Sequence, residues 1–362
     1  MRVAIVNDLA VACEALRRAV ATDPSLSVAW IARDGAEAVE CAKRDRPDLV
    51  LMDLIMPKMD GVAATREIMR VAPCPILVVT ATVSGNAALV YEALGAGALD
   101  AVNTPTIGGK GALDGAAELV RRIRLVARAE GANARASASA SASASRSAPT
   151  GASAASAAIP AAIPAALPVI PGGLPKIVAI GASTGGPRAI ARVLAALPRP
   201  MPFAVVVVQH VSSEFVAGFA EWLGAESQRA VRLARAGDRL RADEIVVAGE
   251  DRHLVATPVG TLAYADEPRE SVHRPAVDEL FASLARHASP GVAVLLTGMG
   301  RDGADGLARL RAAGWHTVAQ DEATSVVWGM PGVAHRMGAA VETLPLESIG
   351  AAVGAAAAIR SR

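Results

Sequence analysis

The sequence has few cysteines and almost no excess charge, and each shortage excludes a class of protein. Cys13, Cys41 and Cys74 are the only cysteines among 362 residues, and their spacing matches no common metal site. We expect them to be small buried apolar side chains in a reducing compartment. The 36 basic residues nearly balance the 35 acidic ones, which leaves a net charge of +1. This balance gives no support for nucleic acid or an anionic membrane as a partner.

Long apolar runs are also missing. The most apolar tract, around residues 157–170, is interrupted by Pro160, Pro164 and Pro168, so we expect no direct membrane insertion. The first residues, MRVAIVND, reach an acid too soon for a secretory signal peptide. The chain is therefore expected to be soluble and cytoplasmic.

A low-complexity stretch divides the chain in two. The Ala/Ser repeat at residues 134–148 cannot bury a core, and the spaced prolines that follow it favour an extended spacer. The chain is long enough for two ordinary domains. We therefore predict a first domain over residues 1–128, an Ala/Ser/Pro linker over 129–174 and a second domain over 175–362.

Both predicted domains alternate apolar runs with helical patterns, which is typical of α/β folds. Five such units in residues 1–128 predict a five-stranded, doubly wound parallel sheet, whose chemistry lies beyond the carboxyl ends of its strands. In the second domain the runs KIVAIG, AVVVVQH, GVAVLLTG and WHTVAQD resume this alternation. Residues 231–266 read as short strands with turn signals. They predict an antiparallel hairpin insertion and a mixed sheet.

Two carboxylates and a hydroxyl lie at predicted strand ends in the first domain. Asp8 ends the first strand, Asp53 the third, and Thr80 the fourth. Paired carboxylates at one sheet edge can bind Mg²⁺ through oxygen. A hydroxyl and a metal beside a carboxylate can stabilise a phosphoryl group during its transfer to that carboxylate. From spacing alone, solvated acids or helix caps remain an equal alternative.

The second domain opens with the turn GASTGG, residues 181–186, between a predicted strand and a predicted helix. A dinucleotide site would require glycine where Ser183 stands, and the ending of a P-loop is absent. The turn instead fits the pattern G-x-S-x-G, which presents a nucleophilic serine. Pro187 opens the following helix, where a missing amide costs nothing.

A serine nucleophile needs a base and an acid. His210 ends the strand AVVVVQ on the same sheet edge, and Asp302 follows another strand, although an N-cap is a strong alternative for Asp302. Backbone N–H groups of Gly298-Met299-Gly300 are suited to an oxyanion hole near that edge. The other histidines are each expected to be structural: His253, His273, His287, His316 and His335.

Several motifs of the first domain carry a family resemblance. MRVAIVND, PDLVLMDLIMPKMDGVAATREIM, PILVVTA and GALDAVNTP resemble the receiver domain of bacterial response regulators over residues 1–125. The resemblance implies that Asp53 accepts a phosphoryl group from a sensor histidine kinase, that Asp8 and Asp53 bind Mg²⁺, and that Thr80 senses the phosphoryl oxygens. Asn7 stands where receivers usually carry an acid, so we expect weaker metal binding. Thr104 stands where they usually carry a lysine, so we expect weaker coupling of the phosphoryl group to movement of the domain.

The second domain also resembles a known family. IGASTGGPRAI, VVVVQHV, HRPAVDELF, LLTGMGRDGADGL and QDEATSVVWGMPGVA resemble the catalytic domain of chemotaxis protein-glutamate methylesterases over residues 175–360. The resemblance implies hydrolysis of glutamate methyl esters, and deamidation of glutamines, on methyl-accepting chemoreceptors, with no cofactor. It assigns Ser183 as nucleophile, His210 as general base and acid, Asp302 as the orienting carboxylate, Thr184 as support for the histidine, and the Met299 amide as oxyanion donor.

The two resemblances together imply a regulated enzyme. The unphosphorylated receiver is expected to cover the active-site edge, and phosphorylation of Asp53 to loosen it. The stretches IVND and VNTP resemble the Wsp-type branch of the family, which serves surface attachment. A non-catalytic adaptor that only docks on receptors is the alternative.

Overall fold

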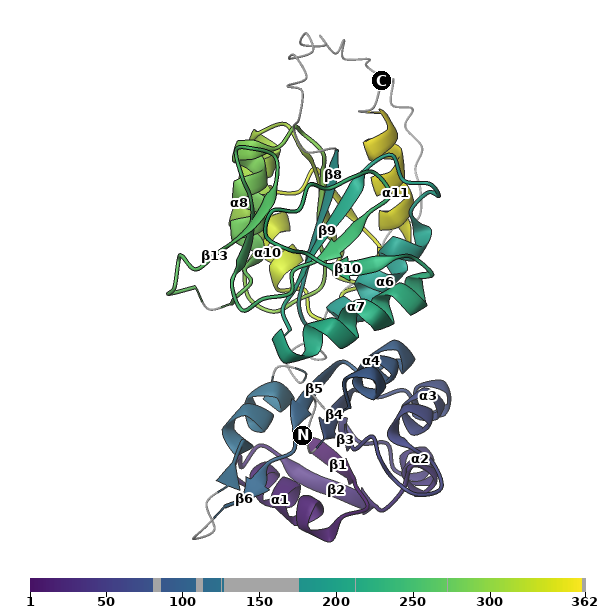
Figure 1. Cartoon of the computed structure of the whole chain (residues 1–362). Coiled ribbons are helices and arrows are strands. Elements are labelled where there is room, and N and C mark those ends of the chain that lie inside the picture. The colour runs from purple at the N-terminus through teal and green to yellow at the C-terminus, as the bar shows by residue number, and fades with distance from the viewer. Residues whose placement is uncertain are drawn as a thin grey trace, which may run out of the picture.

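The structure is a computed structural model that describes residues 1–80, 86–108, 113–124, 126, 176–211, 213–271 and 273–359. It contains two α/β domains stacked along one long axis, with the N-terminal domain at the lower end in Figure 1. The predicted linker, residues 129–174, lies outside the described residues. Cys13, Cys41 and Cys74 are buried free thiols, as expected. Within the described ranges, no helix combines the length and the apolar character needed to cross a membrane.

The N-terminal domain confirms the five-stranded parallel sheet. Its strand order is β2-β1-β3-β4-β5, and every neighbouring pair is parallel. The strands are β1 (Arg2–Val6), β2 (Ser27–Ala32), β3 (Leu49–Met52), β4 (Ile76–Thr80) and β5 (Asp100–Asn103). A two-stranded antiparallel sheet of β6 (Thr106–Ile107) and β7 (Leu113–Asp114) lies beyond β5 in the chain.

Helices cover both faces of this sheet because its buried strands are apolar on both sides. One face packs against α1 (Ala10–Ala21) and the helical residues 116–124. The other face packs against α2 (Gly35–Arg44), α3 (Gly61–Val71) and α4 (Ala87–Ala96). Asp34 and Asp60 cap α2 and α3, since each carboxylate accepts a hydrogen bond from a first-turn N–H.

The C-terminal domain has one seven-stranded sheet in the order β10-β11-β9-β8-β14-β15-β16, and all its pairs are parallel. The strands are β8 (Ile177–Ala182), β9 (Ala204–Gln209), β10 (Val231–Leu233), β11 (Ile245–Val247), β14 (Val292–Leu295), β15 (His316–Gln320) and β16 (Glu342–Leu344). The prediction of a mixed sheet was therefore wrong. Residues 231–233 and 245–247 extend the parallel sheet, and residues 245–247 are buried throughout, as parallel strands covered on both faces are.

The antiparallel hairpin exists but forms a separate sheet. It pairs β12 (His253–Ala256) with β13 (Leu262–Ala265). In β13 buried and partly exposed residues alternate, which is typical of a strand with one covered face. The hairpin packs with α8 (Val277–His287), α9 (Ala304–Ala312) and α10 (Met330–Arg336) on one face of the main sheet. The opposite face carries α6 (Gly186–Ala196), α7 (Ser213–Ser227) and α11 (Leu346–Ile359).

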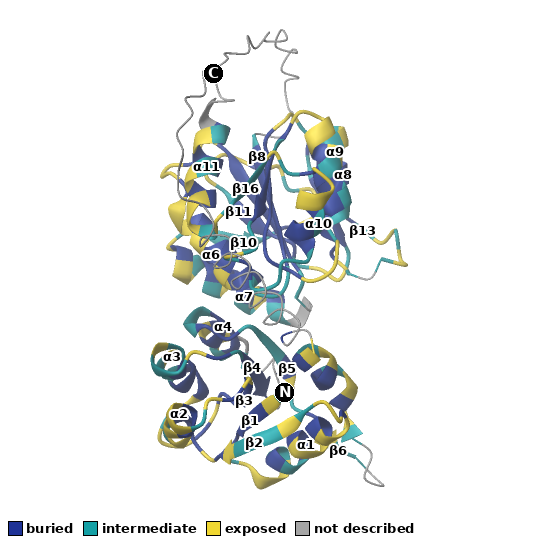
Figure 2. Ribbon diagram, turned by 180° about the vertical axis from the view of Figure 1, so that it is seen from behind, coloured by how far each residue is buried: buried dark blue, intermediate teal, exposed yellow. Residues whose placement is uncertain are grey.

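The two domains meet where α4 packs against α6 and α7, and one cluster of buried apolar residues includes members of both domains. Figure 2 shows α4 facing α7 at this junction. The Tyr91 ring of α4 lies 5.3 Å from the Phe219 ring and 5.9 Å from the Trp222 ring of α7, measured between centroids. The Tyr91 hydroxyl donates to the Phe215 carbonyl at 3.3 Å. An aromatic helix–helix contact thus joins the N-terminal domain to the C-terminal one.

Candidate active site

Three neighbouring strands bring the predicted catalytic residues to one sheet edge. Ser183 follows β8, His210 follows β9, and Asp302 lies in the turn after β14. The strands β9 and β14 lie on opposite sides of β8, so the order of the strands reverses at β8. Such a reversal is a topological switch point, and α/β folds place their ligand-binding sites there. Backbone bonds join the strand ends: Ser183 N–H donates to Thr297 at 3.0 Å, and His210 N–H donates to Ala182 at 3.1 Å.

His210 and Asp302 form a hydrogen-bonded pair that is mostly shielded from solvent. The distance between His210 Nε2 and Asp302 Oδ2 is 2.7 Å, and the two side chains are only 7% and 12% exposed. The backbone N–H groups of Val277 and Asp278 also donate to this carboxylate, at 2.7 and 2.9 Å. Burial alone would raise the pKa of Asp302, but the hydrogen bond and charge of His210 and these two N–H groups hold it below its ordinary value.

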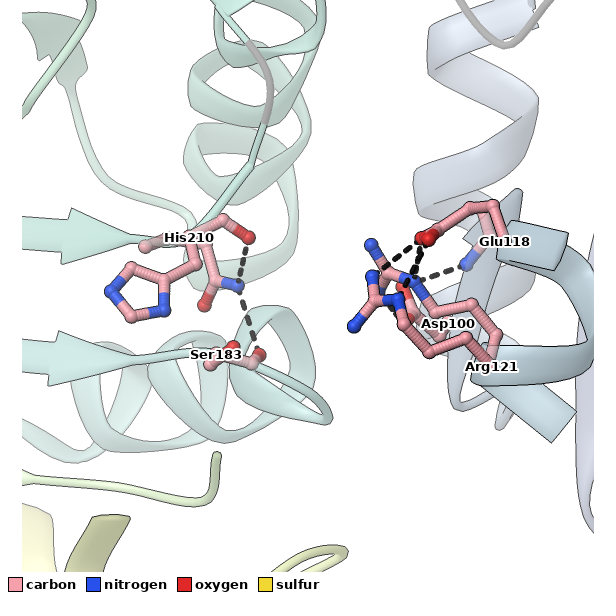
Figure 3. Close-up of polar contacts among 8 residues, drawn as sticks. Asp100, Glu118, Arg121, Ser183 and His210 are labelled. Atoms are coloured by element: carbon pink, nitrogen blue, oxygen red, sulfur yellow. Dashed lines mark hydrogen bonds and ion pairs between the residues drawn. The ribbon is translucent and has the colours of Figure 1, made fainter. Parts of the chain in front are cut away.

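The second ring nitrogen of His210 is available for proton transfer. Among the described residues, the buried His210 Nδ1 has no hydrogen-bond partner. A neutral imidazole that donates from Nε2 to Asp302 leaves Nδ1 as an acceptor. Ser183 and His210 line the same cleft of about 800 Å³, together with Thr184, Met299 and Asp302. Figure 3 shows Ser183 and His210 at the ends of neighbouring strands.

The turn after β14 passes close to Ser183 because Gly298 has no side chain. A Cβ at Gly298 would lie 2.8 Å from the Ser183 Cβ, closer than packed carbons approach each other. The backbone of residues 298–300 therefore lies directly beside the serine, and Met299 lines the cleft. Behind the serine, Gly185 adopts a φ of +77° at the start of α6, a conformation that glycine tolerates best. Thr184 also lines the cleft, and its carbonyl accepts a hydrogen bond from Thr297 Oγ1 at 2.9 Å.

Two residues that sequence reasoning missed lie against this pair. The His273 ring stacks on the His210 ring, with centroids 3.9 Å apart and planes inclined by 16°. Asp278 accepts a hydrogen bond from Gly306 N–H at 2.6 Å. Burial raises the pKa of Asp278 to about 7, and the negative charge of Asp302 adds to this effect. The hydrogen bond from Gly306 opposes it. Both residues belong to the motif HRPAVDELF, which resembles the methylesterase family. The motif could have pointed to these two residues as part of the site.

The N-terminal domain places its predicted residues at the ends of β1, β3 and β4. Asp53 is buried, and it accepts hydrogen bonds from Asn7 Nδ2 at 3.0 Å and from its neighbour Leu54 N–H at 2.8 Å. Burial, and secondly the charge of Asp8, raise the pKa of Asp53 to about 6. Thr80 Oγ1 accepts from Asn86 Nδ2 at 3.1 Å.

The donor set of this pocket fits Mg²⁺ through two carboxylates, Asp8 and Asp53. Magnesium is commonly held by one or two carboxylates, with water and phosphate oxygens as its other ligands. Asn7 adds no charge, because its side chain is a neutral amide. Its oxygen accepts a hydrogen bond from Leu9 N–H, and its nitrogen donates one to Asp53. Within the described part of the chain, no group of three or more His, Cys, Asp or Glu residues could hold a metal ion.

The N-terminal domain also contributes to the walls of the cleft beside Ser183. Arg121 and Arg122 line the 800 Å³ cleft opposite Ser183 and His210. In Figure 3, Asp100, Glu118 and Arg121 face these residues across the gap. Glu118 pairs with Arg121 at 2.6 Å and with Arg122 at 2.8 Å. In this arrangement the N-terminal domain covers one side of the cleft.

Comparisons with known proteins agree with both halves of the chain. Residues 178–353 match the CheB methylesterase family, and residues 3–107 match the response regulator receiver domain. The chain is 48% identical over 350 residues to protein-glutamate methylesterase/protein-glutamine glutaminase 4 of Burkholderia thailandensis, covering 96% of this chain and 95% of that protein. It is 47% identical over 350 residues to protein-glutamate methylesterase/protein-glutamine glutaminase 2 of Cupriavidus metallidurans, covering 96% of each. A solved CheB methylesterase catalytic domain from Thermotoga maritima is 34% identical, with a TM-score of 0.48, and covers 50% of this chain and 98% of its own. The chain therefore belongs to the family of protein-glutamate methylesterases/protein-glutamine glutaminases, with a receiver domain ahead of a CheB methylesterase domain.

Proposed function

We propose that Ser183, His210 and Asp302 carry out the hydrolysis, as nucleophile, general base and acid, and orienting carboxylate. The observation that carries this proposal is the state of His210. Its Nε2 is held by Asp302 at 2.7 Å, and its Nδ1 is left without a partner among the described residues, in the cleft that Ser183 lines. This is the arrangement that a general base needs in order to deprotonate a serine.

The reaction is a double displacement. Ser183 Oγ attacks the ester carbonyl while its proton passes to His210, and the imidazolium then protonates the departing methanol. Water attacks the glutamyl-enzyme with His210 again as base, and this releases the glutamate. A glutamine substrate follows the same path with ammonia as leaving group. The esterase needs no cofactor for these steps.

The oxyanion of each tetrahedral intermediate needs donors beside Ser183. We assign this role to the Met299 amide, since Gly298 brings the backbone of residues 298–300 against the serine. Thr184 supports the histidine from the same cleft wall. The N-terminus of α6, directly behind the turn, favours negative charge at this position.

The proposed substrate is the cytoplasmic domain of a methyl-accepting chemoreceptor, so we place the chain in the cytoplasm. The test measures methanol released from a methylated receptor fragment and ammonia released from a receptor fragment carrying glutamine. We expect both products, and little turnover of small methyl esters, which lack the protein contacts. Receptor binding without either product would support the docking adaptor instead. Turnover of small esters alone would indicate another ester as the substrate.

The receiver is the proposed acceptor for a chemotaxis-type sensor histidine kinase. Asp53 accepts the phosphoryl group, Asp8 and Asp53 hold Mg²⁺ to neutralise its oxygens, and Thr80 responds to it. Phosphorylation then loosens the α4–α7 contact and uncovers the cleft. The domain limits 1–128 and 175–362, the linker 129–174 and the surface-attachment branch stay predictions.

A small phosphodonor such as acetyl phosphate tests the receiver. With Mg²⁺ present we expect the wild type to incorporate one phosphoryl group, and the Asp53→Asn variant to show only background labelling, because its amide is not a nucleophile. Asn7→Asp is expected to lower the Mg²⁺ concentration needed, since it adds a carboxylate to the pocket. Asp60→Asn, which changes only a helix cap, is the matched control. Equal labelling of the wild type and Asp53→Asn would contradict the assignment.

A further inference from the structure

The stacked pair of His210 and His273 is the feature of the active site that the proposed roles leave unexplained. The rings are nearly parallel, at 16°, and their centroids are 3.9 Å apart. His273 lines the same cleft as Ser183 and His210. A face-to-face contact of this kind restricts rotation of the His210 ring, whose edge is already fixed by Asp302.

The segment that carries His273 is anchored by a fully buried histidine. His253 Nδ1 accepts a hydrogen bond from Ala276 N–H at 3.2 Å, so its proton is on Nε2, which donates to the Pro268 carbonyl at 3.1 Å. The two residues after Ala276 donate their N–H groups to Asp302. The same short segment therefore positions both the stacking ring and the carboxylate.

The His273 ring is uncharged at neutral pH. Burial, and secondly the charge of His210, lower the pKa of His273 to about 4. The charged groups that influence the ring also include Asp302 after β14 and the receiver's Arg121 and Arg122. Asp251, Asp278 and Arg301 line the cleft from neighbouring elements, and Arg274 follows His273 in the chain. A neutral aromatic face thus lies on the ring that becomes an imidazolium during catalysis.

We propose that His273 is a positioning residue, whose neutral ring fixes the plane of the His210 imidazole and stabilises the imidazolium by stacking. The inference rests on the proposed function, because it assumes that His210 takes the Ser183 proton. His273 itself gains and loses no proton: the proton moves from Ser183 Oγ to His210 and then to the leaving methanol. An aromatic face over a cation contributes a modest but measurable attraction, more so when the pair is shielded from water.

The test compares His273→Ala with His273→Phe in the full-length protein, by methanol release from a methylated receptor fragment. We expect His273→Ala to lower kcat/KM about 3- to 30-fold. The acid limb of the kcat/KM profile reports protonation of the free base. Because the variant no longer stabilises the imidazolium, we expect this limb to move down by about half a pH unit.

His273→Phe restores an aromatic face that cannot titrate, so it is expected to recover most of the rate and the wild-type acid limb. His335→Ala is the matched control: it removes another histidine–aromatic contact, with Trp328 at 5.5 Å, outside the cleft, and is expected to leave the rate unchanged. A wild-type rate and profile for His273→Ala would overturn the inference, and so would a failure of His273→Phe to exceed it.

Failure of the proposed function gives a different result. If Ser183→Ala releases methanol at the wild-type rate in the same assay, the catalytic assignment is wrong, whatever His273 does. If Ser183→Ala is inactive but His273→Ala matches the wild type, only the stacking role is wrong. Circular dichroism of each variant establishes whether it folds. Should His273→Ala not fold, His273→Gln supplies the ring-free variant, with the same expected loss.

Discussion

Replacement of Ser183 by alanine is expected to lower kcat for methanol release by about 10⁴- to 10⁶-fold, to a residual rate set by binding and the oxyanion donors. Ser183 is the side chain to which we assign the role of nucleophile. It lies at the same sheet edge as His210, whose Nδ1 has no hydrogen-bond partner among the described residues. Without its hydroxyl, no covalent glutamyl-enzyme can form, and water would have to attack the ester directly. Binding of the methylated receptor fragment should persist, because the change removes only one oxygen atom from the cleft.

Ser271 supplies the control for this substitution. It lines the same cleft, and no catalytic role is assigned to it. Ser271→Ala should therefore keep a rate within a few-fold of the wild type. A Ser183→Ala variant as active as Ser271→Ala would contradict the serine mechanism.

Asp302→Asn is expected to cost about 10⁴-fold in kcat while the fold is retained. The carboxylate accepts three hydrogen bonds, from His210 Nε2, Val277 N–H and Asp278 N–H, so both of its oxygens serve as acceptors. An asparagine has one oxygen for these donors. If its NH₂ group faces the ring, His210 must accept at Nε2 and carry its proton on Nδ1, where it cannot take the proton of Ser183.

Asp305→Asn is the matched control for Asp302→Asn. Asp305 lies three residues further along, pairs with Arg301 at 2.8 Å near the surface, and makes no contact with His210. Its loss should change the rate by less than twofold, because exposed pairs contribute little. An Asp302→Asn rate within tenfold of the wild type would show that the carboxylate does not orient the base.

The shared position of the proposed catalytic residues could be predicted from sequence because parallel strands share one carboxyl edge. Ser183, His210 and Asp302 each follow an apolar run, so their proximity needed only the strand order of a parallel sheet. The short runs at residues 231–233 and 245–247 carried no such information. A run of three residues specifies neither the direction of a strand nor its partner. For β10 and β11 both depend on the path of the chain through α7, so the prediction of a mixed sheet was wrong.

The residues that sequence reasoning missed depend on long-range packing. His273 reaches His210 only because the buried His253 holds its segment from the hairpin side. Arg121 and Arg122 reach the cleft because α4 of the receiver packs on α7, a contact with no local sequence signal. The five strands of the receiver's main sheet were predicted correctly, since apolar runs alternate with helical patterns there, whereas the short strands β6 and β7 were not predicted.

The cleft of about 800 Å³ has walls from both domains, with Arg121 on one side and Ser183 on the other. A small molecule seated between them would touch the regulator and the enzyme at once. Such an inhibitor would compete with substrate. It would also contact both walls and so stabilise the arrangement in which the receiver covers the cleft. Because the proposed effect of phosphorylation is to separate these two walls, the inhibitor would bind the phosphorylated protein more weakly. Its apparent potency would therefore depend on how much of the protein is phosphorylated.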